Sequence, residues 1–197
     1  RSLYRQVADQ QVDPVWKVRA LQELADMKAE SRDSEGVVQI TRELLGALPP
    51  GHISAPEARL SLISALLQSS EFSEASRLCE SALSAAPSQT TLQAARVACA
   101  EVDERAGNPE QAMNTYRAVL GDEAPADVLT DAALGLARSA FVLDRPEAIV
   151  APLVKILTQT KAPALRLPLL SMQVRVYRAL ESPVYLAAAS AERDAIA

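Results

Sequence analysis

Few residues of this chain have the types and spacing that catalysis or metal binding requires. The sequence holds one histidine, His52, between Gly51 and Ile53, with no catalytic or metal-binding partner in sequence reach. The phosphate-binding patterns GxGxxG and GxxxxGK[ST] are absent, and so are CxxC, HExxH and GxSxG. We therefore expect His52 to be a solvated loop residue. We expect no enzyme, and no catalytic, metal or cofactor-binding residue.

An acidic cluster at Glu101, Asp103 and Glu104, followed by Arg105, could suggest paired carboxylates for acid–base chemistry. On a helix, however, Glu101 and Arg105 stand one turn apart, where opposite charges form a surface pair. The spacing favours that ion pair over a catalytic site.

The two cysteines, Cys79 and Cys99, are too few for a disulfide framework and lack metal-ligand spacing. Unpaired cysteines are usually buried as small hydrophobic side chains. We expect this for both, with a disulfide between adjacent helices as the alternative.

Composition excludes several classes of partner. The 197 residues are 49% hydrophobic and 23% charged, which suits a packed core. The net charge of −5, with no local cluster of Lys and Arg, argues against nucleic acid. No apolar run approaches the roughly 20 residues that cross a bilayer, so we expect no membrane span in this chain.

A segment with helix signals at both ends occurs repeatedly. In residues 106–125, Asn108 can cap a helix, Pro109 can open it, and Pro125 follows its end. Similar segments begin near residues 32, 71, 144 and 182. Aligned on a small residue near the helix start, they recur at intervals of 36 to 39 residues, which puts in register Val37, Ala75, Ala112, Ala148 and Ala187.

Each of these helices follows another amphipathic segment, and turn residues separate the two. The preceding segments are 15–28, 56–69, 92–104, 131–143 and 167–180. Self-similarity at this period predicts an all-α fold, an α-solenoid of antiparallel helix pairs.

At this point the chain resembles the tetratricopeptide repeat (TPR) family. The family's second-helix signature is Ala, then an aromatic residue four positions on, then a later Pro. It is matched by Ala112, Tyr116 and Pro125 and, with Cys in place of the aromatic residue, by Ala75, Cys79, Ala82 and Pro87. The first-helix signature is poorly kept, and we expect the family's usual glycine to be lost from every first helix.

The resemblance implies a right-handed, TPR-like superhelix that forms a single domain over residues 1–197. We expect a half-unit at 1–14, then repeats at about 15–51, 52–89, 90–125, 126–163 and 164–197, the last incomplete. Both ends look cut from a longer protein. HEAT repeats, with periods of about 40–47 residues, are the alternative.

In the TPR family, first helices line a concave face that holds peptides or partner helices. Carried onto this chain, the resemblance gives candidate binding residues at the inward, non-core positions of the first helices. They are Arg19, Gln22, Asp26, Leu60, Ser64, Arg96, Asp103, Leu134, Arg138, Phe141 and Gln173. The Lys–Asn pairs that grip chaperone carboxylates are missing at these places.

Two functions remain open. The first is a protein-binding scaffold that takes a peptide or partner helix on its concave face. The second is a structural spacer or assembly platform in a bacterial envelope machine for secretion or exopolysaccharide export. Location in the periplasm or the cytoplasm of a bacterium fits either function. Exposed apolar residues at both ends, among them Leu3 and Ile196, also predict end-to-end self-association.

Overall fold

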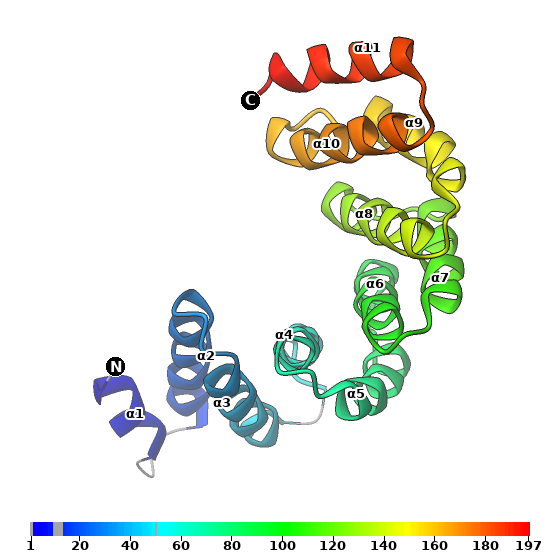
Figure 1. Cartoon of the computed structure of the whole chain (residues 1–197). Helices are drawn as coiled ribbons and strands as arrows, with labels where there is room; N and C mark the ends of the chain where they lie inside the picture. The colour runs from blue at the N-terminus through cyan, green and yellow to red at the C-terminus, as the bar shows by residue number, and fades with distance from the viewer. Residues whose placement is uncertain (1, 10–13, 50) are drawn as a thin grey trace. The chain divides into compact units, whose positions relative to one another are not determined.

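The computed structural model describes residues 2–9, 14–49 and 51–197 (Figure 1). Over these residues the chain is helical and contains no β-strand. It divides into two compact units, Arg1–Ala98 and Cys99–Ala197. The all-α fold predicted from the repeat is therefore confirmed, whereas the repeat boundaries and the single domain stay predictions.

The N-terminal unit holds α1 (Ser2–Asp9), α2 (Pro14–Glu30), α3 (Ser34–Ala47), α4 (Ala55–Gln68) and α5 (Phe72–Ser84), and α6 (Gln89–Arg105) begins within it. In this unit the helices α1 to α5 each pack on the next along the chain. A core of small and branched side chains, including Leu21, Leu24 and Ile40, contains residues from all four helices α1, α2, α3 and α4. Helix α1 lies within the predicted half-unit 1–14, of which residues 1 and 10–13 lie outside the described residues.

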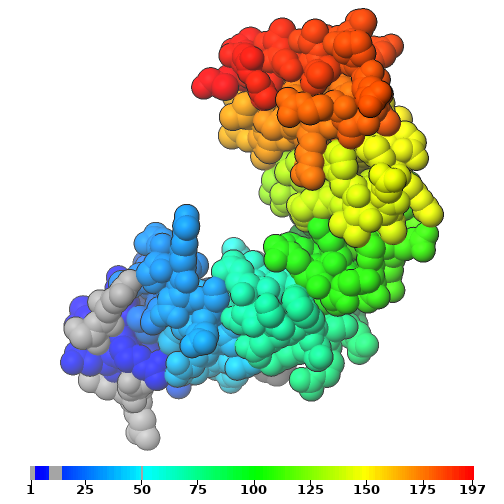
Figure 2. Space-filling view, viewed as in Figure 1, coloured from blue at the N-terminus to red at the C-terminus, as the bar shows by residue number. Residues whose placement is uncertain are grey.

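The C-terminal unit holds the end of α6 and the elements that follow it. These are α7 (Pro109–Gly121), α8 (Ala126–Val142), a short 3₁₀ helix η1 (Pro146–Ile149), α9 (Val150–Gln159), α10 (Pro163–Ala179) and α11 (Pro183–Asp194). Helix α8 packs on α7, α9 and α10, and α10 packs on α11. In the space-filling view the side chains from α8 to α11 form one continuous body (Figure 2).

Five turns with the same backbone geometry separate the paired helices. Each contains one residue with positive φ, between 50° and 89°, and these residues are Arg32, Ser70, Gly107, Asp144 and Glu181. The next residue's N–H donates to a carbonyl five residues back, at 2.8 to 3.0 Å. This is the Schellman arrangement, which satisfies helix-end carbonyls. Successive left-handed residues stand 37 or 38 positions apart, so the turns mark the period.

These turns correct the register that we predicted from small residues. The residue five positions after each left-handed residue is the fourth residue of the second helix that follows. These residues are Val37, Ala75, Ala112, Ile149 and Leu186. The first four are buried. The predicted Ala148 is half-buried, and Ala187 is exposed. The alignment was wrong by one residue in the last two copies, because a large residue takes the small residue's place there.

One first helix does keep the family's usual glycine, which is Gly135, so the expectation that it is lost from every first helix was wrong. It lies in α8, where an added Cβ would stand 2.2 Å from Cζ of the Tyr116 ring. Tyr116 on α7 is fully buried. The signature therefore survives in one repeat as Leu134–Gly135, because only a residue without a side chain lets the aromatic ring approach so closely.

Both cysteines differ from the expectation. Cys79 is buried and Cys99 is half-buried, and both are disulfide-bonded rather than free. The prediction of two unpaired thiols was wrong, because sequence spacing does not reveal which sulfur atoms a fold brings into bonding range.

Exposed apolar side chains occur on the first and last helices. Leu3 is 68% exposed on α1, and Tyr185 is 63% exposed on α11. The predicted end-to-end association is not tested by this structure and stays a prediction.

Candidate functional site

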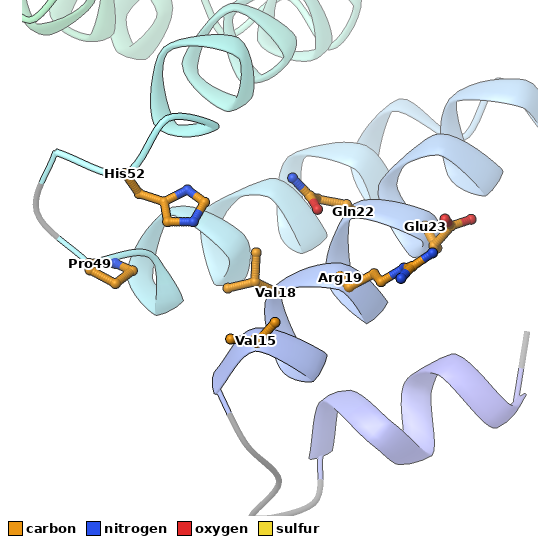
Figure 3. Close-up of a pocket in the computed structure, with 7 residues that line it drawn as sticks. All are labelled: Val15, Val18, Arg19, Gln22, Glu23, Pro49 and His52. Atoms are coloured by element: carbon orange, nitrogen blue, oxygen red, sulfur yellow. The ribbon is translucent and has the colours of Figure 1, made fainter.

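A pocket of about 440 Å³ opens beside α2 in the N-terminal unit (Figure 3). Val15 and Val18 on α2 form its apolar part, and Pro49 and His52 stand on the facing side. Its polar lining is contributed by Arg19, Gln22 and Glu23. The pocket therefore combines apolar and charged lining residues, which is the usual composition of a site for an organic ligand.

Local structure fixes the position of His52. Its backbone N–H donates to the carbonyl of Pro49 at 3.1 Å, and its Nδ1 accepts from the N–H of Ser54 at 3.2 Å. The side chain is half-buried rather than solvated. His52 therefore lies in a loop, as expected, but it is less exposed to solvent than expected, and it lines the first pocket opposite α2.

A second pocket, of about 340 Å³, adjoins the first and shares Gln22 and Glu23 with it. Residues from α2, α3, α4 and the turn before α4 line it. The acidic members are Glu23, Asp26 and Glu57, the hydroxyl-bearing members are Thr41, Ser54 and Ser61, and no Lys, Arg or His is among the lining residues. This pocket is hence acidic, whereas the first is largely apolar.

Thr41 is the buried polar group of the second pocket. The residue is 1% exposed, and its Oγ1 has no hydrogen-bond partner among the described residues. A buried hydroxyl without a partner costs free energy, on the order of 1–3 kcal/mol. Such groups are rare in native proteins and call for an explanation.

The C-terminal unit has a charged cluster of a different kind. Arg138 on α8 donates to Glu104 through Nε at 2.8 Å and through Nη2 at 3.0 Å. The Tyr116 hydroxyl donates to the same carboxylate at 3.2 Å. Only 10% of the Glu104 side chain is exposed. A bidentate pair at such a site is a strong structural contact.

The electrostatics of this cluster follow from burial. Burial, and then the negative charge of Glu104, raise the pKa of the Tyr116 hydroxyl. Burial alone would lower the pKa of Arg138, but the hydrogen bond to Glu104 and the charges of Glu104, Tyr116 and Glu101 together outweigh this and raise it. Burial also raises the pKa of Asp103, and burial with repulsion from Asp127 raises that of Asp131. The cluster keeps Arg138 charged and Tyr116 neutral.

The surface pair predicted at Glu101 and Arg105 is confirmed, at 3.4 Å. Other polar groups of this unit also contact one another. The guanidinium of Arg175 lies 4.4 Å from the centre of the Phe141 ring. The Gln173 amide donates to the Tyr177 hydroxyl at 3.4 Å.

The structure brings some of the predicted binding residues together. Arg19, Gln22 and Asp26 line the two adjoining pockets, and Ser64 lines a third, of about 180 Å³. Leu60 and Leu134 are half-buried at equivalent places on α4 and α8. Arg138 and Phe141 are held by Glu104 and Arg175.

Three predicted residues fall on another register. Counted from the left-handed turn residue, Arg96 takes the place of buried Ala133. In the same way Asp103 takes the place of Ala140, and Gln173 that of Leu136. The count from the turns therefore groups them with core positions, apart from the other candidates.

Sequence reasoning missed several lining residues of the two adjoining pockets. They are Val15, Val18, Glu23, Thr41, Pro49, His52, Ser54, Glu57 and Ser61. The spacing of the turns could have found Glu57, because it precedes Ser70 by the same 13 residues that separate Arg19 from Arg32. Nothing in the sequence pattern indicated that the turn before α4 would close the first pocket.

The described residues hold no group of three or more side chains that could bind a metal ion. Of the helices that the structure describes, none combines the length and the apolar character needed to span a membrane.

Solved structures resemble the chain closely in fold, although no family model and no curated protein sequence matches it. Nearly identical TPR-like repeats assigned to a kinesin light chain of Podosopora anserina align with TM-score 0.72 and 16% identity over 95% of this chain and 97% of theirs. BtubC (BKLC) from P. vanneervenii gives 0.69 and 17% over 99% and 85%.

A tetratricopeptide repeat protein from Parabacteroides merdae gives TM-score 0.66 and 16% identity over 91% of this chain and 65% of its own. At such identities the likeness concerns the fold alone. The chain therefore has the tetratricopeptide-like helical repeat fold that its sequence period indicated.

Proposed function

We propose that the chain is a protein-binding scaffold that takes a peptide or a partner helix on α2 and α4 of its N-terminal unit. The supporting observation is the pair of adjoining pockets that share Gln22 and Glu23. A concave site with an apolar part and a few polar groups is the expected form of a ligand site. Tetratricopeptide-like helices present such faces to extended or helical peptides, which supports the same proposal.

The polar groups around these pockets are available to a partner. Gln22, Glu23 and Asp26 have no hydrogen bond or ion pair to another described residue. A polar side chain that is already paired within the protein must break that contact before it can bind a partner. Gln22, Glu23 and Asp26 have no such contact to break. The N-terminal unit is thus better suited to binding than the Arg138 region.

The test is selection of random peptides displayed on phage against the purified chain, followed by affinity measurement with synthetic peptides. Gln22→Trp, which puts a bulky ring where the pockets meet, should abolish binding. Gln39→Trp makes the same change at an exposed position of α3 and should leave affinity unchanged. Failure to select any peptide, or equal affinities for both variants, would remove this function from the pockets.

A second candidate is the structural spacer in a bacterial envelope machine. The observation that favours it is the disulfide bonding of Cys79 and Cys99, because disulfides persist in oxidising compartments such as the periplasm. We expect dithiothreitol to lower the melting temperature of the oxidised protein. An unchanged melting temperature, or free thiols in protein exported to the periplasm of a bacterial host, would remove this support.

A further inference from the structure

The position of Thr41 in the repeat explains why the acidic pocket is open. Thr41 and Tyr116 each follow the left-handed residue of their repeat by nine positions, Arg32 in one case and Gly107 in the other. Ser61 and Gly135 likewise occupy equivalent places in the next first helix. In the C-terminal unit the Tyr116 ring fills the space against Gly135. In the N-terminal unit the short side chains of Thr41 and Ser61 line a cavity instead.

The chemistry of that cavity indicates the charge of its ligand. Its lining carries three carboxylates and no basic side chain, and Glu23, Asp26 and Glu57 are exposed at its edge. None of the three has an ion-pair partner among the described residues. A cation that enters the pocket could therefore pair with these carboxylates without displacing another positively charged group.

Thr41 supplies an independent sign of a ligand. Its buried Oγ1 lacks a partner among the described residues, yet the side chain belongs to the lining of the acidic pocket. The Oγ1 has almost no exposed surface, so a guanidinium or ammonium group in the pocket would donate a hydrogen bond to it once the Thr41 side chain turned its hydroxyl toward the pocket. The donor would satisfy the polar atom that the fold leaves unpaired.

We propose that the N-terminal unit recognises a segment that pairs an apolar side chain with an Arg or Lys, the apolar residue in the pocket at Val15 and Val18 and the cation in the acidic pocket at Asp26, Glu57 and Thr41. This inference rests on the proposed peptide-binding function and names the peptide's chemistry. The two pockets meet at Gln22 and Glu23, so one short segment can reach both.

The direct test uses fluorescein-labelled ten-residue peptides of Ala and Ser that carry one Leu and one Arg at separations of one to four residues. The control peptides replace Arg with citrulline, which keeps the shape and removes the charge. We expect the best Leu–Arg peptide to bind about tenfold more tightly than the matching citrulline peptide, because only Arg carries the positive charge that pairs with the carboxylates. Its affinity should fall as salt is raised.

Variants of the chain locate the cation. Asp26→Asn with Glu57→Gln should remove the preference for Arg over citrulline. Glu35→Gln, at an exposed carboxylate of α3, should leave that preference intact. Asp26→Lys with Glu57→Lys should favour peptides that carry Leu and Glu. If the preference for Arg persists in the double neutral variant, the assignment of the cation to this pocket is wrong.

A third variant rebuilds the filled arrangement of the other unit. Thr41→Tyr with Ser61→Gly reproduces the Tyr116–Gly135 contact and should close the acidic pocket. We expect an unchanged or higher melting temperature together with loss of the preference for Arg. A well-folded double variant that still prefers Arg over citrulline would overturn the proposal.

The outcomes separate this inference from the proposed function. If peptides bind through Gln22 but Arg and citrulline are equivalent, the basic specificity is wrong and the scaffold function stands. If no peptide binds at all, both fail.

Discussion

Equivalent positions on the first helices of the two units differ in whether the side chain there is paired. Asp26 and Arg138 each precede the left-handed turn residue by six positions. Arg138 is bound in a bidentate pair with Glu104, whereas Asp26 lines a pocket without a described partner. One repeat architecture can therefore use the same position for internal cohesion or leave it open to a ligand.

The second helices differ in how they fill the space against the next first helix. In the C-terminal unit the Tyr116 ring fills the space against α8, and its hydroxyl donates to Glu104, which in turn holds Arg138. Where Thr41 replaces the ring, neither the volume nor the hydrogen bond is supplied, and a cavity remains beside α4. Side-chain size at one position of the second helix thus governs whether the space against the next first helix is filled or open.

The largest effect is expected where the filled arrangement is tightest. Gly135→Ala would place a Cβ 2.2 Å from the buried Tyr116 ring, so we expect a loss of about 1–3 kcal/mol in unfolding free energy. Gly121→Ala, where a Cβ meets nothing within 4 Å, should change stability by less than about 0.5 kcal/mol. Urea unfolding measures both, and equal midpoints would show that the ring can move aside.

Removing the charge of Glu104 should lower the unfolding free energy somewhat less than Gly135→Ala does. Glu104→Gln keeps the shape but removes the charge that faces Arg138 and Tyr116, so we expect a loss of about 1–2 kcal/mol. Asp26→Asn, at the equivalent of Arg138, should leave stability within about 0.5 kcal/mol. Thermal melts of the two variants test the comparison directly. A destabilised Asp26→Asn protein would contradict the view that its carboxylate serves a ligand.

The turns should behave alike in both units. Ser70→Gly and Asp144→Gly each relieve a side chain held at positive φ, so we expect gains of a few tenths to about 1 kcal/mol. Ser76→Gly makes the same replacement on the exposed face of α5 and should cost up to about 1 kcal/mol. Opposite signs for Ser70 and Ser76 are the decisive result in chemical denaturation.

The smallest effect concerns pH. Because burial and repulsion raise the pKa of Asp131, the folded chain binds that proton more tightly than the unfolded chain. Stability from this group is therefore present at low pH and declines as pH rises from 3.8 through the raised value. Asp131→Asn should raise the melting temperature slightly at neutral pH and flatten this decline. A melt series over pH, with Glu123→Gln as control, measures it; an unchanged profile would contradict the expected repulsion.

The sequence predicted the helical repeat because the period is carried by helix starts such as Asn108–Pro109 and by closing prolines such as Pro125. Register was less secure, because small residues do not mark the same place in each copy, as Ala148 and Ala187 show. The left-handed residues mark it without error, but only Gly107 among them is a residue type that indicates positive φ.

The candidate site was predictable only in part. Arg19, Gln22 and Asp26 followed from the first-helix pattern and do line pockets. His52 lines the first pocket from the turn before α4, and no periodicity indicates where that turn lies. The cavity at Thr41 arises from a missing ring, and an absent side chain is visible only by comparison with Tyr116 in another repeat.

A corner held by main-chain hydrogen bonds makes little demand on the side chain that stands in it. Arg32, Ser70, Asp144 and Glu181 occupy the same corner as Gly107, so the corner holds a basic, a neutral and two acidic side chains. Within this chain the repeat is therefore marked more consistently by distances of 37 or 38 residues between corners than by residue identities. A search for its relatives should score that spacing first.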